Sequence, residues 1–115
     1  MKIEVVDRGD KDFDRTFWRG YVSGVSYKKM VDKFGMPQEA DSDKLQFEWF
    51  ISFPEAEAFA HVYDWKTPPD MDVMDVTEWS VAGAPAGRVE LAFTCVVATL
   101  KGNHAAIRSV FGKKR

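Results

Sequence analysis

The sequence predicts an α+β fold in which a small antiparallel β-sheet carries two main helices packed on one face. Segments 44–53 and 58–66 alternate apolar and polar residues as half-buried strands do, with a short turn sequence between them. Segments 26–35 and 89–102 space their apolar residues as helices do. The chain has 115 residues, 45% of them hydrophobic, and no linker or repeat, so we expect one domain over residues 1–115 that ends in a short basic tail.

The N-terminal part is predicted to supply two strands. Ile3, Val5 and Val6 favour a short first strand, and segment 16–24 has the aromatic and β-branched content of a second. The Arg-Gly-Asp sequence at 8–10 lies in the polar stretch between them. Because the chain begins with polar residues and shows no secretion signal, we interpret this tripeptide as a turn and not as an adhesion motif.

The first helix has a predicted start and a predicted stop. Ser26 can accept a hydrogen bond as N-cap, and Gly35 can adopt the left-handed backbone that ends a helix. Pro37 then prevents the helix from continuing. The apolar residues between these limits follow the spacing i, i+3, i+4, i+7 and form one buried face: Tyr27, Met30, Val31 and Phe34.

The two alternating segments are expected to form an antiparallel hairpin that turns at residues 54–57. In the second strand, Phe59, His61, Tyr63 and Trp65 share one side, and we expect Phe59 to fill the core. The pattern leaves open whether Tyr63 and Trp65 also fill the core or form an exposed binding rim. The residues predicted to be largely buried are Phe34, Phe47, Trp49, Ile51, Phe59 and Val96.

The C-terminal part is predicted to contain one more strand and the second main helix. Segment 76–83 reads as a strand, and 84–88 as a turn. From Val89 the apolar residues follow a helical face up to Gly102, although the β-branched content leaves a strand as the competing interpretation. A short helical turn around 107–111 should precede the basic tail.

The charge distribution is asymmetric along the chain. Residues 1–80 carry 10 Lys and Arg against 17 Asp and Glu, a net charge of −7, and residues 81–115 carry 6 against 1, a net of +5. An acidic body argues against a nucleic-acid partner and suits a basic protein surface. Since no apolar run approaches about eighteen residues, we expect no membrane span and a cytoplasmic location.

Few residues could support catalysis. Cys95 lies in an apolar run, where burial makes a thiol inert, and it has no cysteine partner for a disulfide. His61 lies within a strand among aromatic residues, which favours a structural role. No Cys or His pair has the spacing of a zinc site, and no glycine-rich loop could hold phosphate. We therefore expect no enzyme activity, no metal and no cofactor.

Three short motifs follow one another in a recognisable order: FGMP at 34–37, YDWK at 63–66 and EWSVAG at 78–83. This order resembles a group of small accessory proteins of tailed bacteriophages and prophages. The resemblance covers residues 17–83, and residues 54–57 depart from it because the group usually turns on an acidic residue followed by glycine. It implies a phage accessory protein in the host cytoplasm and carries over no catalytic residue.

The aromatic and charged cluster at the end of the second hairpin strand is the best candidate for a binding site. Trp, Tyr and Arg are enriched among the residues that dominate interface energetics, and Trp18, Tyr21, Trp49 and Trp79 add to the aromatic content. The first hypothesis is that this cluster binds a host protein, in host modulation or anti-defence. The second is that it binds a small nucleotide-like ligand by stacking. Self-association of the chain also stays open. The candidate binding residues are Arg19, Tyr63, Asp64, Trp65, Lys66, Asp70 and Asp72.

Overall fold

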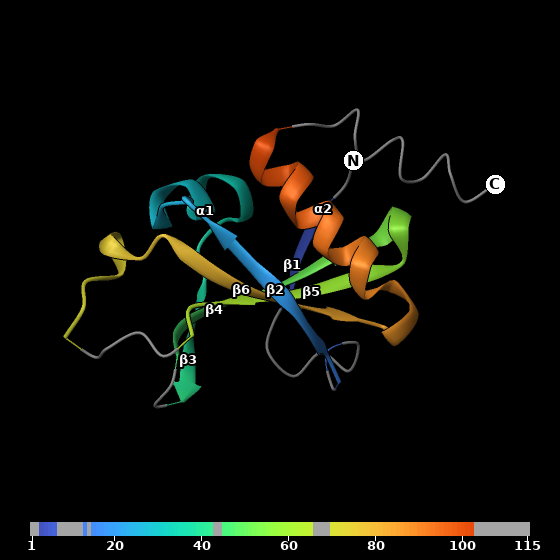
Figure 1. Cartoon of the computed structure of the whole chain (residues 1–115), viewed down its shortest axis with the longest axis horizontal. Helices are drawn as coiled ribbons and strands as arrows, with labels where there is room; N and C mark the ends of the chain where they lie inside the picture. Colours follow the sequence, from blue (N-terminus) through green and yellow to red (C-terminus); the bar gives the residue numbers. More distant parts are fainter. Residues whose placement is uncertain (1–2, 7–12, 14, 43–44, 66–69, 103–115) are drawn as a thin grey trace.

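The computed structural model describes residues 3–6, 13, 15–42, 45–65 and 70–102. Six strands form one antiparallel sheet, and both helices lie on the same side of it (Figure 1), which confirms the predicted α+β class. The strands and helices are β1 (Glu4–Val6), β2 (Phe17–Ser23), α1 (Tyr27–Phe34), β3 (Gln38–Ser42), β4 (Leu45–Phe53), β5 (Ala58–Tyr63), β6 (Glu78–Ala84) and α2 (Val89–Lys101). The short 3-10 turns are η2 (Pro54–Ala56), η3 (Val73–Asp75) and η4 (Ala86–Arg88).

The sheet is built around the meander β4–β5–β6, in which each strand pairs antiparallel with the next. β2 pairs with β6 and forms one edge of the sheet. At the other edge, β4 is long enough to pair with β3 along its first half and with β1 along its second half. The sequence did not predict β3, because its residues, QEADS, are mostly polar and show no apolar alternation.

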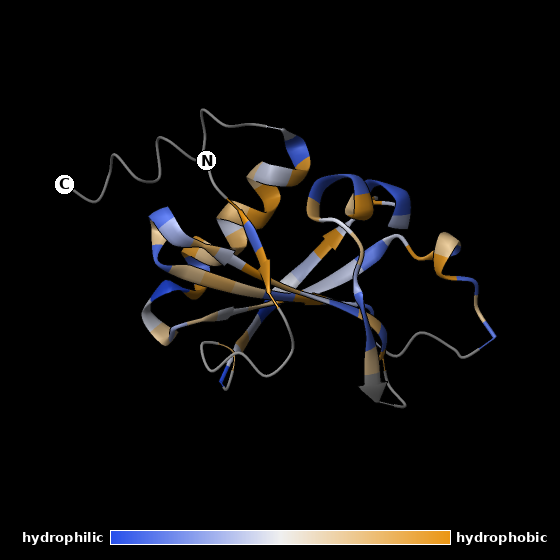
Figure 2. Ribbon diagram, turned by 180° about the vertical axis from the view of Figure 1, so that it is seen from behind, coloured by the Kyte–Doolittle hydropathy of each residue, from blue (hydrophilic) through white to orange (hydrophobic). Residues whose placement is uncertain are grey.

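Helix α1 begins and ends as predicted. Ser26 accepts a hydrogen bond from the N–H of the third residue after it, at 3.1 Å. Gly35 has a φ of 81°, and its N–H donates to the carbonyl of Val31 at 2.8 Å, which closes the last turn. Hydrophobic and hydrophilic residues alternate around α1 in Figure 2, and Met30 and Phe34 are the buried ones.

The hydrophobic core lies between the sheet and the two helices. Trp49 and Trp79 are fully buried, and their rings meet edge to face with centroids 5.3 Å apart. Each indole N–H donates to a backbone carbonyl, Trp49 to Gly35 at 2.8 Å and Trp79 to Val25 at 2.7 Å. Both tryptophans are therefore core residues, so they do not belong to the interface aromatics that the sequence suggested.

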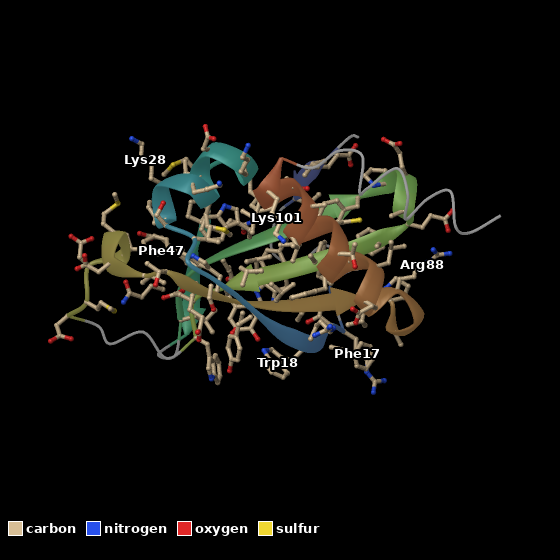
Figure 3. All side chains as sticks on the ribbon, turned by 45° about the horizontal axis from the view of Figure 1, so that its top comes forward. Phe17, Trp18, Lys28, Phe47, Arg88 and Lys101 are labelled. Atoms are coloured by element: carbon tan, nitrogen blue, oxygen red, sulfur yellow. The ribbon has the colours of Figure 1, made fainter. Side chains whose placement is uncertain are left out.

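The helix-facing side of β4 agrees with the predicted register. Phe47 lies on this side as predicted but is only half-buried, less than expected, because it stands near the start of β4 at the margin of the core. Its ring centroid is 5.8 Å from that of Tyr27 in α1 (Figure 3). The other predicted core residues of this layer are buried as expected: Phe34, Trp49, Ile51 and Val96.

The large side chains of β5 lie on the opposite face of the sheet from the one predicted. Ala58, Ala60 and Val62 are buried against the helices, so small side chains lie beneath α2. Phe59 is half-buried on the other face, where the ring of Phe13 meets it edge to face at 5.6 Å. The prediction that Phe59 fills the helix-side core is wrong, because a helix can approach a sheet closely only over small residues.

Residues 89–101 form helix α2, which confirms the helical interpretation and excludes the competing strand. The helix ends at Gly102, whose φ is 68°. α2 also passes very close to β6 at Gly83, where an added Cβ would lie 3.0 Å from the Cα of Val89 and 3.1 Å from the Cβ of Ala92. Glycine at this position allows the contact between helix and sheet.

The predicted turns fall partly within the described residues. The turn before α2 is confirmed, with a cis peptide bond between Ala84 and Pro85 followed by η4. The expected turn at 8–10, the short helical turn at 107–111 and the basic tail lie outside the described residues. In the part of the chain that the structure describes, neither helix has both the length and the apolar character needed to cross a membrane.

Candidate binding site on the open face of the sheet

Aromatic residues gather on the face of the sheet turned away from α1 and α2, which we call the open face. The strand register places Tyr63 of β5 opposite Ser80 of β6, and Ser80 opposite Tyr21 of β2. Trp18 of β2 lies opposite Ala82, and Figure 3 shows it on the side of the sheet away from α2. Residues that are far apart in the sequence therefore become neighbours across β6.

Four aromatic side chains surround a depression of about 400 Å³ on the open face, which we call the aromatic depression. Its lining residues are Trp18, Tyr21, Tyr63, Trp65 and Ser80. Ser80 is only 2% exposed, whereas Trp18, Tyr21 and Trp65 are 56%, 49% and 44% exposed. The depression exists because β6 presents small residues between the large rings of β5 and β2, so the rings form walls and Ser80 lies at the base.

The rings of the aromatic depression form two perpendicular pairs. Trp18 and Tyr21 meet at an interplanar angle of 70° with centroids 5.2 Å apart, and Tyr63 and Trp65 meet at 80° and 6.1 Å. Edge-to-face contact is a favourable arrangement for aromatic rings, so the two rings of each pair stabilise each other's position. Burial raises the pKa of the Tyr63 phenol above its ordinary value of 10.0, with a smaller contribution from Tyr21, so the hydroxyl is neutral at physiological pH.

A histidine and a glutamate lie next to the aromatic depression. Nε2 of His61 is 2.8 Å from Oε1 of Glu48, and both side chains are mostly buried. The imidazole stacks on Phe50 with centroids 4.5 Å apart and planes 5° from parallel, and it contacts Tyr63 at 4.6 Å. This packing agrees with the structural role predicted for His61.

Asp64 does not take part in the accessible surface, although it stands between Tyr63 and Trp65 in the sequence. Its side chain is fully buried. One carboxylate oxygen accepts hydrogen bonds from the backbone N–H groups of Gln46 and Phe47 at 2.9 and 2.8 Å, and the other lies 3.2 Å from the Gln46 nitrogen. The carboxylate thus attaches the end of β5 to the start of β4 and holds the two flanking rings in place.

Arg19 belongs to the helix side of the sheet and not to the aromatic depression. Its guanidinium makes a two-point contact with Glu90 of α2, with Nη2 3.0 Å from Oε1, and lies 4.5 Å from the ring centroid of Phe93. The hydrogen bond from Arg19 lowers the pKa of the Glu90 carboxyl below its ordinary value. Neighbouring residues of a strand project to opposite faces, so Arg19 faces the helices when Trp18 faces away from them. The β-bulge between Trp18 and Gly20 inserts one extra residue and thereby lets Trp18 and Tyr21, three residues apart, share the open face.

The remaining charged candidates lie on the connection between β5 and β6. Asp70 and Asp72 are exposed, and neither lines the aromatic depression. The carboxylate of Asp72 accepts a hydrogen bond from the N–H of Met74 at 2.9 Å and so caps η3. Lys66 lies outside the described residues.

Groups suited to covalent or metal chemistry are sparse in the described ranges. Burial of Cys95 raises the pKa of its thiol to about 11, so the reactive thiolate is scarce at neutral pH. Among the residues that the structure places, no three His, Cys, Asp or Glu side chains come close enough to hold a metal ion.

A second hollow, of about 340 Å³, lies between β2 and the two helices. Its lining combines four aliphatic residues with the aromatic residues Tyr21 and Phe93 and with two lysines, Lys29 and Lys101. Two aromatic residues line this hollow, whereas four line the aromatic depression, which we therefore treat as the candidate site.

Trp18 and Tyr21 are site residues that the sequence did not assign to the YDWK cluster. The useful signal was their position on a predicted strand, but nothing local indicates that this strand pairs with β6. Comparisons with protein-family models, curated proteins and solved structures find no match for this chain. The open face of the sheet is therefore the feature of this chain that bears on its function.

Proposed function

We propose that this chain is a non-enzymatic binding protein of a bacteriophage or prophage that attaches to a host protein through the open face of its sheet, in host modulation or anti-defence. The phage origin rests on the motif order FGMP, YDWK and EWSVAG. The binding role rests on one observation: four partly accessible aromatic rings from two distant chain segments surround a single depression. Aromatic residues in such positions are typical anchors of protein interfaces.

The charge of the chain supports a basic surface on the partner. Residues 1–80 carry a net charge of −7, with 10 Lys and Arg against 17 Asp and Glu. Asp70 and Asp72, on the connection between β5 and β6, are exposed. Exposed carboxylates at the rim of an interface mainly increase the association rate and its salt dependence. We therefore assign the binding energy mainly to the aromatic rings and the acceleration of association with the partner to the acidic residues.

The test is capture of a partner from host lysate by the tagged protein, followed by measurement of the dissociation constant with the purified partner. Trp65→Ala should weaken binding at least about thirtyfold, because truncated aromatic anchors typically cost about 2 kcal/mol or more. Its melting transition should stay cooperative, since Trp65 is 44% exposed. Met36→Ala is the matched control, because Met36 is 69% exposed and does not line the depression.

Two results would contradict the proposal. If Trp65→Ala binds the purified partner as tightly as the original protein, the aromatic depression is not the interface. If Asp70→Asn with Asp72→Asn changes neither the association rate nor its salt dependence, the acidic connection does not steer the partner. Asparagine is the suitable replacement at 72, because it removes the charge and can still cap η3.

The alternative function is sequestration of a nucleotide-like small ligand in the aromatic depression. The observation in its favour is the number of aromatic surfaces available for stacking on a flat ring. Mass spectrometry of the purified protein would reveal a co-purified nucleotide, and Trp65→Ala should lose it.

A further inference from the structure

We propose that the aromatic depression binds an organic cation, and that its occupant is an arginine or lysine side chain projecting from the partner protein. This inference rests on the proposed function, because it names the part of the partner that the open face receives. It is carried by the orientation of the rings, by the charges around them and by the shape of the depression.

The ring orientations favour a compact cation over a flat aromatic ligand. A flat aromatic ligand held by stacking on both of its faces needs two parallel rings. The depression offers two pairs that are 70° and 80° from parallel, so adjacent walls meet nearly at right angles. A cation needs no parallel surfaces, because the face of any accessible ring attracts it through the ring quadrupole, as in aromatic cages for ammonium ions.

The electrostatic surroundings point to the same ligand class. None of the five lining residues carries a charge, so no cation of the described residues occupies the depression. Glu78 lies on the open face two residues before Ser80 in β6, and its carboxylate is 3.4 Å from the hydroxyl of Ser23. Glu48 lies opposite Tyr63, but its carboxylate already contacts His61 at 2.8 Å. The exposed carboxylate of Glu78 beside neutral rings therefore favours a cation at the site and disfavours phosphate.

The shape of the depression decides between a free cation and a side chain. A volume of about 400 Å³ exceeds that of a single ammonium group, and three of its four rings are between 44% and 56% exposed. Most drug-sized ligands are bound in sites that bury most of their surface, and this site leaves its rings half open. An arginine or lysine side chain extended from a protein surface matches such an opening, because the partner's own surface covers the rest.

The experiment is a nuclear magnetic resonance titration that follows the four tryptophan indole signals. The probes are a short neutral peptide with one central arginine and the same peptide with citrulline, which has the same shape without the charge. The arginine peptide should shift the signals of Trp18 and Trp65, and the citrulline peptide should bind about tenfold more weakly. The buried Trp49 and Trp79 serve as internal controls, since their N–H groups are bonded to backbone carbonyls and should not shift.

Two variants test the site from opposite directions. Trp18→Ala removes one wall and should weaken arginine-peptide binding several-fold. Ser80→Leu keeps all four rings but fills the base of the depression, and it should reduce peptide binding at least as strongly. Unchanged Trp49 and Trp79 signals in both variants verify that the fold is intact, and Met36→Ala should bind like the original protein.

Three outcomes would overturn the inference. Equal binding of the citrulline and arginine peptides would show that charge is not recognised. Stronger binding of adenosine monophosphate than of the arginine peptide would assign the site to flat anionic ligands. Binding of choline but not of the arginine peptide would assign it to a free small cation. If the peptides fail while a purified partner still requires Trp65, only this inference falls; if Trp65→Ala also leaves partner binding unchanged, the proposed function falls with it.

Discussion

Replacing Asp64 with alanine should destabilise the domain because the carboxylate has a structural role. It is fully buried and is the side-chain acceptor for two backbone N–H groups, those of Gln46 and Phe47, at 2.9 and 2.8 Å. Hydrogen bonds to a charged group contribute about 1.5–3 kcal/mol each, and two that share one carboxylate are not fully additive. We expect Asp64→Ala to lower the free energy of unfolding by about 3 kcal/mol, which corresponds to roughly 10 °C in Tm for a domain of this size.

The assay is urea denaturation followed by tryptophan fluorescence, since Trp49 and Trp79 lie in the core. Asp64→Asn keeps an oxygen acceptor but loses the charge, so its cost should be about half as large. Asp70→Ala is the control, because Asp70 is exposed and its replacement should change stability by less than about 0.5 kcal/mol. A loss below about 1 kcal/mol in Asp64→Ala, combined with weakened partner binding, would refute the structural role and restore Asp64 to the binding surface.

Three further predictions concern the backbone and the thiol. Gly83→Ala should lower the free energy of unfolding by about 1–3 kcal/mol, because the added Cβ would lie 3.0 Å from the backbone of α2. Gly20→Ala is the control: its nearest contact is 4.0 Å, so it should be neutral or slightly stabilising. Equal effects of the two variants in urea denaturation would contradict the tight packing at β6. Gly35→Ala should cost about 1 kcal/mol in the same assay, because φ is 81° and no neighbour lies within 4 Å, so backbone strain is the whole effect, and no change would refute it. At pH 8, Cys95 should react with a thiol reagent at least about a hundredfold more slowly in the folded protein than in the unfolded protein. The reason is that a pKa of about 11 leaves roughly one thiol in a thousand ionised, and burial limits access of the reagent. Comparable rates would show that α2 opens readily.

Local patterns in the sequence were sufficient for most of the secondary structure. The cap at Ser26 and the stop at Gly35 depend on interactions within a few residues, so they could be predicted and are confirmed. The alternation along β4 and β5 likewise depends on strand geometry alone. β3 was not predicted, because its polar sequence shows no alternation of apolar residues and, among the described strands, it pairs only with β4.

The site was decided by tertiary structure. Alternation assigns Phe59, Tyr63 and Trp65 to one face of β5 but cannot tell which face the helices cover, and α2 covers the side with the small residues because only there can it approach closely. Trp18 and Tyr21 lie near Tyr63 and Trp65 because β2 and β5 pair with the two sides of β6. This pairing joins segments that are far apart in the sequence, so no short segment predicts it. The sequence by itself therefore determined which residues are aromatic, acidic and strand-forming. Only the packing of α2 and the strand order placed four of those rings around one depression and buried Asp64 against the start of β4.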